Sequence, residues 1–129
     1  MDIAGSVAGG SGRRLTWVWW AIVAVALVVL TGFAGITWSI RSGVRAATET
    51  AVQEYPGDGT LALIAFVESD DQPLSARNRA VWALGQLRDP RALPTLERHF
   101  TGEPCDHARI LCQYELKKAI DLIRPHARQ

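Results

Sequence analysis

The sequence has few cysteines and no excess of charge of either sign. Its 129 residues hold 14 Lys and Arg against 13 Asp and Glu, a formal net charge of +1, with only 2 Cys. Two cysteines are too few for a disulfide-rich scaffold, and they leave the cellular compartment open. Without a strongly basic surface the chain has no long-range attraction for phosphates, so we expect no nucleic-acid partner.

The sequence also lacks the patterns of strands and of catalytic sites. No stretch alternates between apolar and polar residues as a half-buried strand does, so we expect an all-α fold. Asp106 and His107 stand together without a placed nucleophile, since Ser69 and Ser75 fit turn or cap positions. We therefore expect no enzyme, no catalytic residue and no cofactor.

Charge is absent from one long stretch near the beginning of the chain. Residues 15–40 contain no charged side chain, and as a helix they would reach roughly 39 Å, enough to cross a bilayer. The flanks carry basic and aromatic residues typical of membrane boundaries, namely Arg13, Arg14, Arg41, Arg45, Trp17, Trp19, Trp20 and Trp38. This pattern predicts a retained single-pass anchor, with the lipid bilayer as a partner. A cleaved signal peptide is the alternative, but its apolar region is usually only about 7 to 15 residues long.

The anchor divides the chain into four predicted parts. Residues 1–14 are rich in Gly and Ser and are expected to be a flexible tail. Residues 15–40 form the transmembrane helix and residues 41–58 a juxtamembrane helix and linker, in which residues 44–55 continue the membrane helix. Residues 59–129 form the helical domain. Arginines are equally numerous beside the two membrane ends, and we favour the extracytoplasmic side for the domain.

Four helical segments are predicted in that domain: 60–68, 74–87, 91–100 and 107–123. Pro73 and Ser75 signal the start of the second segment, while Asp89 and Asp106 can cap the third and fourth. A shift of 32 residues superimposes one pair of segments on the next. It aligns Leu61 with Leu93, Ala76 with Ala108, Arg77 with Arg109, Ala80 with Cys112, Trp82 with Tyr114 and Leu84 with Leu116. Two copies of one helical hairpin are therefore expected.

The stretch ARNRAVWALGQLRDPRALPTL, residues 76–96, resembles the HEAT-like repeats of phycobilisome lyases. The resemblance implies an armadillo-like helical fold, here a short α-solenoid of two hairpins after the transmembrane helix. The second copy departs from the pattern, because Lys117 replaces the glycine equivalent to Gly85 and residues 101–106 form an unusual linker. Since solenoids generally need about three repeats, either the helix at 44–55 caps the domain or a partner completes its core.

The resemblance also implies a binding surface, because the second helices of HEAT-like hairpins usually line the concave side. The corresponding polar and aromatic residues are Asn78, Arg79, Trp82, Gln86, Tyr114, Lys117 and Lys118. Aromatic rings beside Arg and Lys are common interface anchors, so we expect these residues to bind another protein, one associated with the membrane. In the alternative, Trp82 packs under the helix at 44–55 and the lysines only face solvent.

A second cluster could ligate a metal through His99, Cys105, His107 and Cys112, although its spacing fits no standard zinc motif. In the favoured alternative, Cys105 packs against Ile110 before a helix that starts at Asp106, and Cys112 fills a core position. A disulfide between the two cysteines looks awkward, because seven residues of one helix span about 10.5 Å.

The sequence thus predicts a membrane-anchored HEAT-like interaction module, for instance an accessory or scaffold subunit of a membrane complex. One alternative is a metal- or redox-responsive domain that uses Cys105, His107 and Cys112. A bilin-lyase-like ligand enzyme is another, suggested by the resemblance alone.

Overall fold

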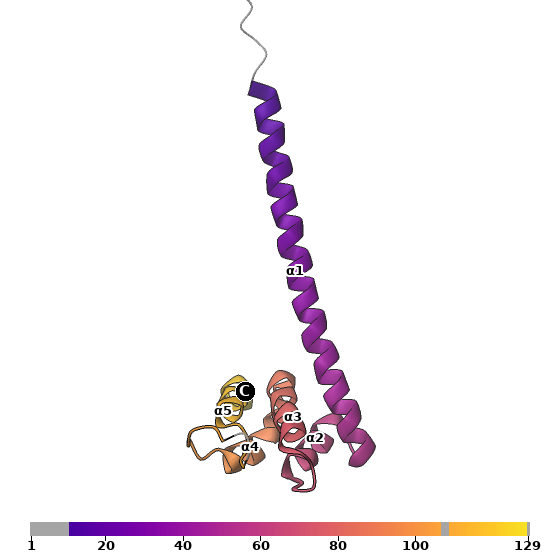
Figure 1. Cartoon of the computed structure of the whole chain (residues 1–129), viewed down its shortest axis with the longest axis vertical. Coiled ribbons are helices and arrows are strands. Elements are labelled where there is room, and N and C mark those ends of the chain that lie inside the picture. The colour runs from indigo at the N-terminus through magenta and orange to yellow at the C-terminus, as the bar shows by residue number, and fades with distance from the viewer. Residues whose placement is uncertain (1–10, 107–108, 129) are drawn as a thin grey trace, which may run out of the picture. The chain divides into compact units, whose positions relative to one another are not determined.

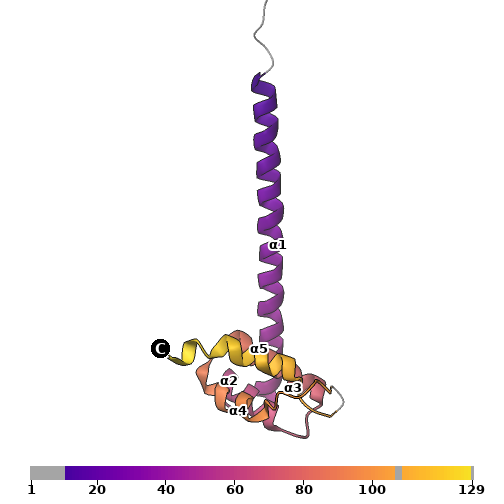
Figure 2. The same cartoon turned by 90° about the vertical axis from the view of Figure 1, so that its left-hand side faces the viewer.

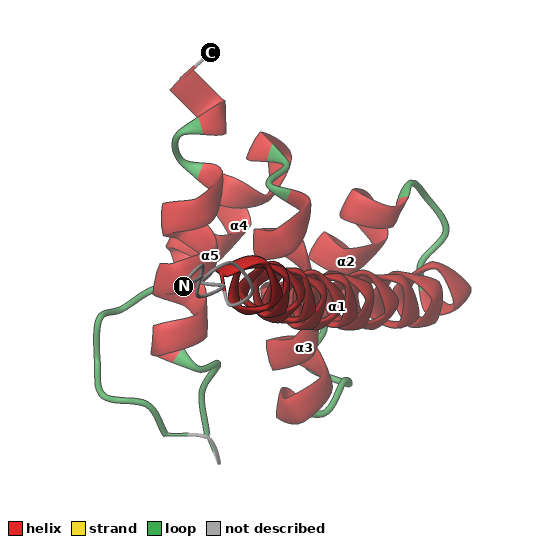
Figure 3. Cartoon of the chain, turned by 90° about the horizontal axis from the view of Figure 1, so that it is seen from above, coloured by secondary structure: helices red, strands yellow, loops and turns green. Residues whose placement is uncertain are grey.

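A computed structural model describes residues 11–106 and 109–128 of the chain, which form helices joined by loops and include no strand (Figure 3). The helices are α1 (Ser11–Glu54), α2 (Gly59–Glu68), α3 (Leu74–Leu87), η1 (Pro90–Ala92), α4 (Leu93–His99), α5 (Gln113–Ile123) and η2 (His126–Arg128). The all-α prediction is confirmed. Residues up to Ser39 form one compact unit and residues from Ile40 onward form another.

Helix α1 contains the whole charge-free stretch (Figure 1). By length and composition it could cross a membrane, a test that a signal sequence near the N-terminus also passes. Two hydroxyl groups in its apolar part bond to carbonyls of the same helix: Thr31 Oγ1 donates to the Leu27 carbonyl at 2.9 Å and Thr37 Oγ1 to the Ala34 carbonyl at 2.9 Å. The helix runs without interruption to Glu54, which confirms that residues 44–54 continue it. Residues 1–10 of the predicted tail lie outside the described residues.

The second unit is a small bundle in which α2 packs on α3, and α5 packs on both α3 and α4 (Figure 2). Its apolar core centres on fully buried side chains: Leu63, Val67, Val81, Leu84, Leu96, Leu116 and Ile123. Ala47 and Ala51 near the end of α1 are buried in the same cluster. The last turns of α1 therefore cap the first hairpin, as one of the two sequence-based alternatives required.

The last hairpin differs from its prediction. The segment expected at 91–100 is the 3₁₀ turn η1 followed by α4, which ends at His99, and this is close to the prediction. The helix expected at 107–123 is wrong at its start, because α5 begins at Gln113 and Cys112 is its N-cap residue. The Cys112 N–H donates to Asn78 Oδ1 at 2.8 Å rather than to a carbonyl of a preceding helical turn. Residues 107 and 108 lie outside the described residues.

Helices α3 and α5 approach closely at one glycine. A Cβ atom on Gly85 would lie 2.9 Å from both Cα and Cβ of Ala119, closer than side chains tolerate. Because the obstacle includes backbone, only a residue without a side chain fits at position 85 in this packing. The crossing fixes the distance between the two helices that carry the predicted binding residues.

Candidate functional site

The outer sides of α3 and α5 form one continuous surface. Trp82, Gln86, Lys118 and Leu122, together with Glu115, line a narrow groove over the Gly85 crossing that has no room for a water molecule. Tyr114, Lys117, Lys118 and Leu122 line an adjoining pocket of about 300 Å³. Lys118 and Leu122 belong to both, so the groove and the pocket are continuous. We call this the α3–α5 surface, and define it by Trp82, Gln86, Tyr114, Lys117, Lys118 and Leu122.

The two aromatic residues of the α3–α5 surface are exposed to different degrees. Tyr114 is 66% exposed, against 49% for Leu61, the next most exposed large apolar residue among those described beyond Ile40. Trp82 is half-buried, and its indole contacts α1, since a Cβ on Gly43 would lie 3.1 Å from Trp82 Cη2. Trp82 thus combines both sequence-based alternatives: part of its ring packs against the end of α1 and part lines the groove.

Two residues predicted for this surface have other places in the structure. Asn78 is half-buried and uses its Oδ1 atom to accept the Cys112 N–H. Arg79 lines a separate pocket of about 90 Å³ with Ala46, Thr50 and Phe66, at the junction of α1, α2 and α3. The structure therefore gathers Trp82, Gln86 and the three α5 residues on one surface. It leaves Asn78 and Arg79 outside it.

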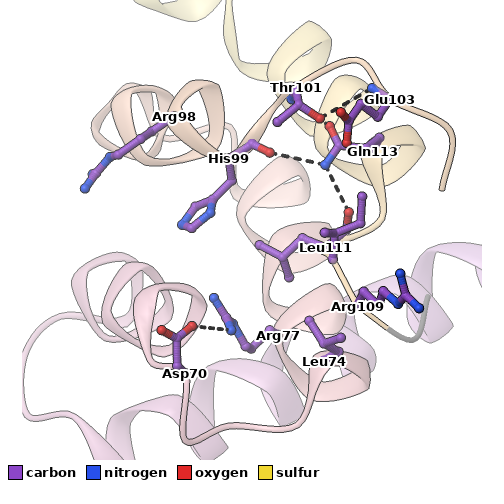
Figure 4. Close-up of a pocket in the computed structure, with 11 residues that line it drawn as sticks. Asp70, Leu74, Arg77, Arg98, His99, Thr101, Glu103, Arg109, Leu111 and Gln113 are labelled. Carbon is purple, nitrogen blue, oxygen red and sulfur yellow. Dashed lines mark hydrogen bonds and ion pairs between the residues drawn. The ribbon is translucent and has the colours of Figure 1, made fainter. Parts of the chain in front are cut away.

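A second pocket of about 300 Å³ is polar and lies between α3, α4 and the loop before α5 (Figure 4). Its lining includes the buried Arg77, whose Nε atom donates to the Val67 carbonyl at 2.8 Å and whose Nη1 atom donates to Asp70 at 2.8 Å. Arg98, also at the pocket, is paired with Glu68 at 2.8 Å. Both arginines thus bond to other residues of the domain, which weakens the case for a ligand site here.

Gln113 holds the opposite side of this polar pocket in place, and sequence analysis missed it. Its Oε1 atom accepts the N–H groups of Thr101 at 2.8 Å and Gly102 at 3.2 Å. Its Nε2 atom donates to the carbonyls of His99 at 3.2 Å and Leu111 at 3.1 Å. No sequence signal marks this role, because a glutamine inside a predicted helix is ordinarily a solvent-facing residue.

His99 lines the same pocket and is partly buried. Burial, followed by the charges of Arg77 and Arg98, lowers the pKa of His99 below its ordinary value. The imidazole is therefore neutral at pH 7, as it would also need to be in a metal site. The described residues nevertheless contain no group of three or more His, Cys, Asp or Glu placed to hold a metal ion. His107, the remaining member of the predicted cluster, lies outside the described residues.

The two cysteines are much closer than a shared helix would allow. Cys105 Sγ and Cys112 Sγ are 3.2 Å apart, and both thiols are free. The objection to a disulfide assumed that both residues belong to one helix, whereas α5 begins after Cys112 and the preceding loop returns Cys105 to its N-terminus. Cys112 is buried as expected, whereas Cys105 is exposed and α5 starts at Gln113 rather than at Asp106.

Comparison with known proteins identifies one family. A model of the PBS lyase HEAT-like repeat matches residues 76–101, which include most of α3 and all of η1 and α4. This confirms the HEAT-like resemblance for that one stretch. HEAT-like repeats are typically non-catalytic and generally mediate protein–protein interaction. Neither a curated protein nor a solved structure matches the chain.

Proposed function

We propose that this chain is a membrane-anchored, non-catalytic HEAT-like module that binds another membrane-associated protein through the α3–α5 surface. It would act as an accessory or scaffold subunit of a membrane complex. The observation that carries the proposal is the continuous surface with an exposed tyrosine, formed in part by a helix that matches a HEAT-like repeat.

The chemistry of the α3–α5 surface suits a protein partner. Tyr114 offers a large, exposed amphipathic ring, and Leu122 adds apolar area beside it. Lys117 is neutralised by Asp121 at 2.6 Å, whereas Lys118 forms no ion pair with a described residue. A partner with an apolar pocket for the tyrosine and an acidic rim for Lys118 would complement this arrangement.

The anchor supports binding at the membrane. In α1 the charge-free stretch ends at Ile40, and Gly43, which contacts Trp82, follows less than one helical turn later. If residues 15–40 span the bilayer, the chain leaves the span only three residues before the glycine that contacts Trp82. We place the domain on the extracytoplasmic side.

Intact-mass analysis of the chain from washed membranes tests the anchor. A cleaved leader would remove residues 15–40 and lower the mass accordingly.

A ligand enzyme of the bilin-lyase type is less well supported. The polar pocket and the pocket beside Tyr114 are each about 300 Å³, at the small end of the range for small-molecule sites. A large chromophore would need a bigger enclosure. In the polar pocket, Arg77 already bonds to Asp70, and Gln113 already bonds to the backbone of Thr101. We therefore propose binding rather than catalysis.

The test is a pull-down of the tagged full chain from native membranes in a mild detergent. Tyr114→Ala and Lys118→Glu should each reduce recovery of a stoichiometric partner about tenfold or more, as expected when an interface anchor is lost. Leu61→Ala is the matched control, since Leu61 is the next most exposed of the large apolar residues described beyond Ile40 but lies on α2. Arg79→Ala should also leave recovery unchanged. Equal loss of the partner with all four variants, or no loss with any of them, would contradict the assigned surface.

A further inference from the structure

The two cysteines lie at the beginning of α5, beside the proposed binding surface but with no role in it. Cys105 is exposed and Cys112 is buried, and their sulfur atoms are 3.2 Å apart. Bonding distance for two sulfurs is about 2.05 Å, so the atoms need to approach by only about 1 Å. The chain from Cys105 to Cys112 can therefore close into a covalent loop with little movement of α5.

The N-terminus of α5 also favours a thiolate on one particular cysteine. The Tyr114 N–H, in the first turn of α5, points at Cys105 Sγ at 3.4 Å. First-turn N–H groups carry partial positive charge and stabilise anions. This hydrogen bond, and then the one from the Cys112 thiol, lower the pKa of Cys105, whereas burial raises the pKa of Cys112. The exposed sulfur is thus the better nucleophile at neutral pH.

We propose that Cys105 and Cys112 are a reversible disulfide-forming pair, with Cys105 as the attacking thiolate and Cys112 as the resolving thiol. The oxidant is a small disulfide of the glutathione type or a protein disulfide. This activity is independent of the proposed partner binding.

The exchange proceeds in two balanced steps. The Cys105 thiolate attacks one sulfur of the oxidant, so a mixed disulfide forms and the first thiolate of the oxidant leaves. Cys112 loses its proton to solvent and attacks Cys105 Sγ, which forms the intramolecular bond and releases the second thiolate. Two electrons pass from the cysteine pair to the oxidant, whose two sulfurs leave as thiols once they take up the two protons.

The local contacts keep the resolving thiol in place for the second step. Cys112 is fixed by the hydrogen bond from its backbone N–H to Asn78 Oδ1 at 2.8 Å. Gln113, the next residue, binds the backbone of Thr101 and Gly102 near Cys105. The first bond fixes Cys112 against α3, and the bonds of Gln113 hold the segment before Cys105 against the start of α5, which raises the effective concentration of the second thiol.

The test equilibrates the full chain in mild detergent with excess oxidised glutathione, blocks free thiols with N-ethylmaleimide and digests with trypsin. Trypsin cleaves after Arg109, so an intramolecular bond joins peptides 99–109 and 110–117. We expect this linked pair in the wild type, and its loss after dithiothreitol. Two alkylated thiols, or only intermolecular dimers, would overturn the proposal.

Single variants test the two roles. Cys112→Ser should accumulate glutathione on Cys105, because the first step occurs and the second cannot. Cys105→Ser should leave Cys112 largely unmodified, with alkylation slower by roughly tenfold or more than that of Cys105 in Cys112→Ser. The reverse pattern would refute the assignment. Because no partner is present, these results do not depend on the α3–α5 surface.

Discussion

Helices α3 and α5 occupy equivalent places in the two hairpins, yet only their C-terminal parts are alike. With the 32-residue shift, Leu84 and Leu116 correspond, and both are fully buried. The start of α3 at Leu74 corresponds to Asp106, but α5 begins only at Gln113. The part of the repeat that makes the apolar core is therefore retained. In the second copy residues 109–112 are not helical, and Cys105 lies in the segment before them.

The equivalent arginines show what the second copy has lost. Arg77 is buried and donates to the Val67 carbonyl and to Asp70, so it ties α3 to the end of α2. Arg109 is 85% exposed and lies 3.7 Å from Asp106. The same residue in the same repeat position thus stabilises the first hairpin and contributes little to the second.

The largest predicted difference comes from removing these arginines. Arg77→Ala should lower the free energy of unfolding by about 2 to 3 kcal/mol, because it deletes a buried side chain and leaves the Val67 carbonyl without its donor. Arg109→Ala should change it by less than about 0.5 kcal/mol. Chemical unfolding of the full chain in detergent, followed by circular dichroism, measures both.

A third variant separates packing from hydrogen bonding. Arg77→Met keeps most of the buried volume but donates no hydrogen bond, so it should recover part of the loss and not all of it. Equal effects of Arg77→Ala and Arg109→Ala would show that the two hairpins are more alike than their contacts indicate.

The second prediction concerns the helix crossing. Gly85→Ala gains about 1 kcal/mol of helix propensity but places a Cβ 2.9 Å from the Ala119 backbone, an overpacking that typically costs about 1 to 3 kcal/mol. We expect a net loss of about 1 kcal/mol. Lys117→Ala, at the equivalent position on α5, should be nearly neutral because Lys117 is exposed. A more stable Gly85→Ala variant would mean that the helices separate without cost.

The sequence predicts the core of this fold better than its loops. Apolar spacing identified α2, α3 and the C-terminal part of α5, because the buried positions recur at helical intervals. The start of α5 was missed, since it depends on Asn78, which lies 34 residues from Cys112, and on the side chain of Gln113. Contacts between distant residues leave no periodic signal in the sequence.

The candidate site was also predicted in part, with the residues of α5 placed better than those of α3. Helical geometry correctly grouped Tyr114, Lys117 and Lys118, which share one side of α5. The same reasoning put Asn78 and Arg79 on this surface. It could not foresee that Asn78 would accept the N–H of Cys112, or that Arg79 would lie in a pocket beside α1. The proximity of the cysteines was missed for the same reason.

The smallest predicted effect concerns the junction that joins the two hairpins. Arg91 contacts Asp58, the N-cap of α2, at 2.6 Å and Asp89, the N-cap of η1, at 2.6 Å. Thirty-two residues further on stands the buried Ile123, so this ion-pair junction has no counterpart at the end of the second hairpin.

The junction makes stability depend on pH in a defined direction. The bonds from Arg91 lower the pKa of Asp89 to about 2, from an ordinary value of 3.8. The unfolded chain therefore binds more protons between these values, and the stabilisation present above about pH 4 is lost as the pH falls toward 2. Since Arg91 is half-exposed, we expect a loss of less than about 1 kcal/mol. Unfolding of wild type and Arg91→Met at pH 5 and pH 2.5 isolates the joint contribution of Asp58 and Asp89, because carboxylates that do not contact Arg91 affect both proteins alike. An identical pH dependence in the two would show that the junction adds nothing to the contact between the hairpins.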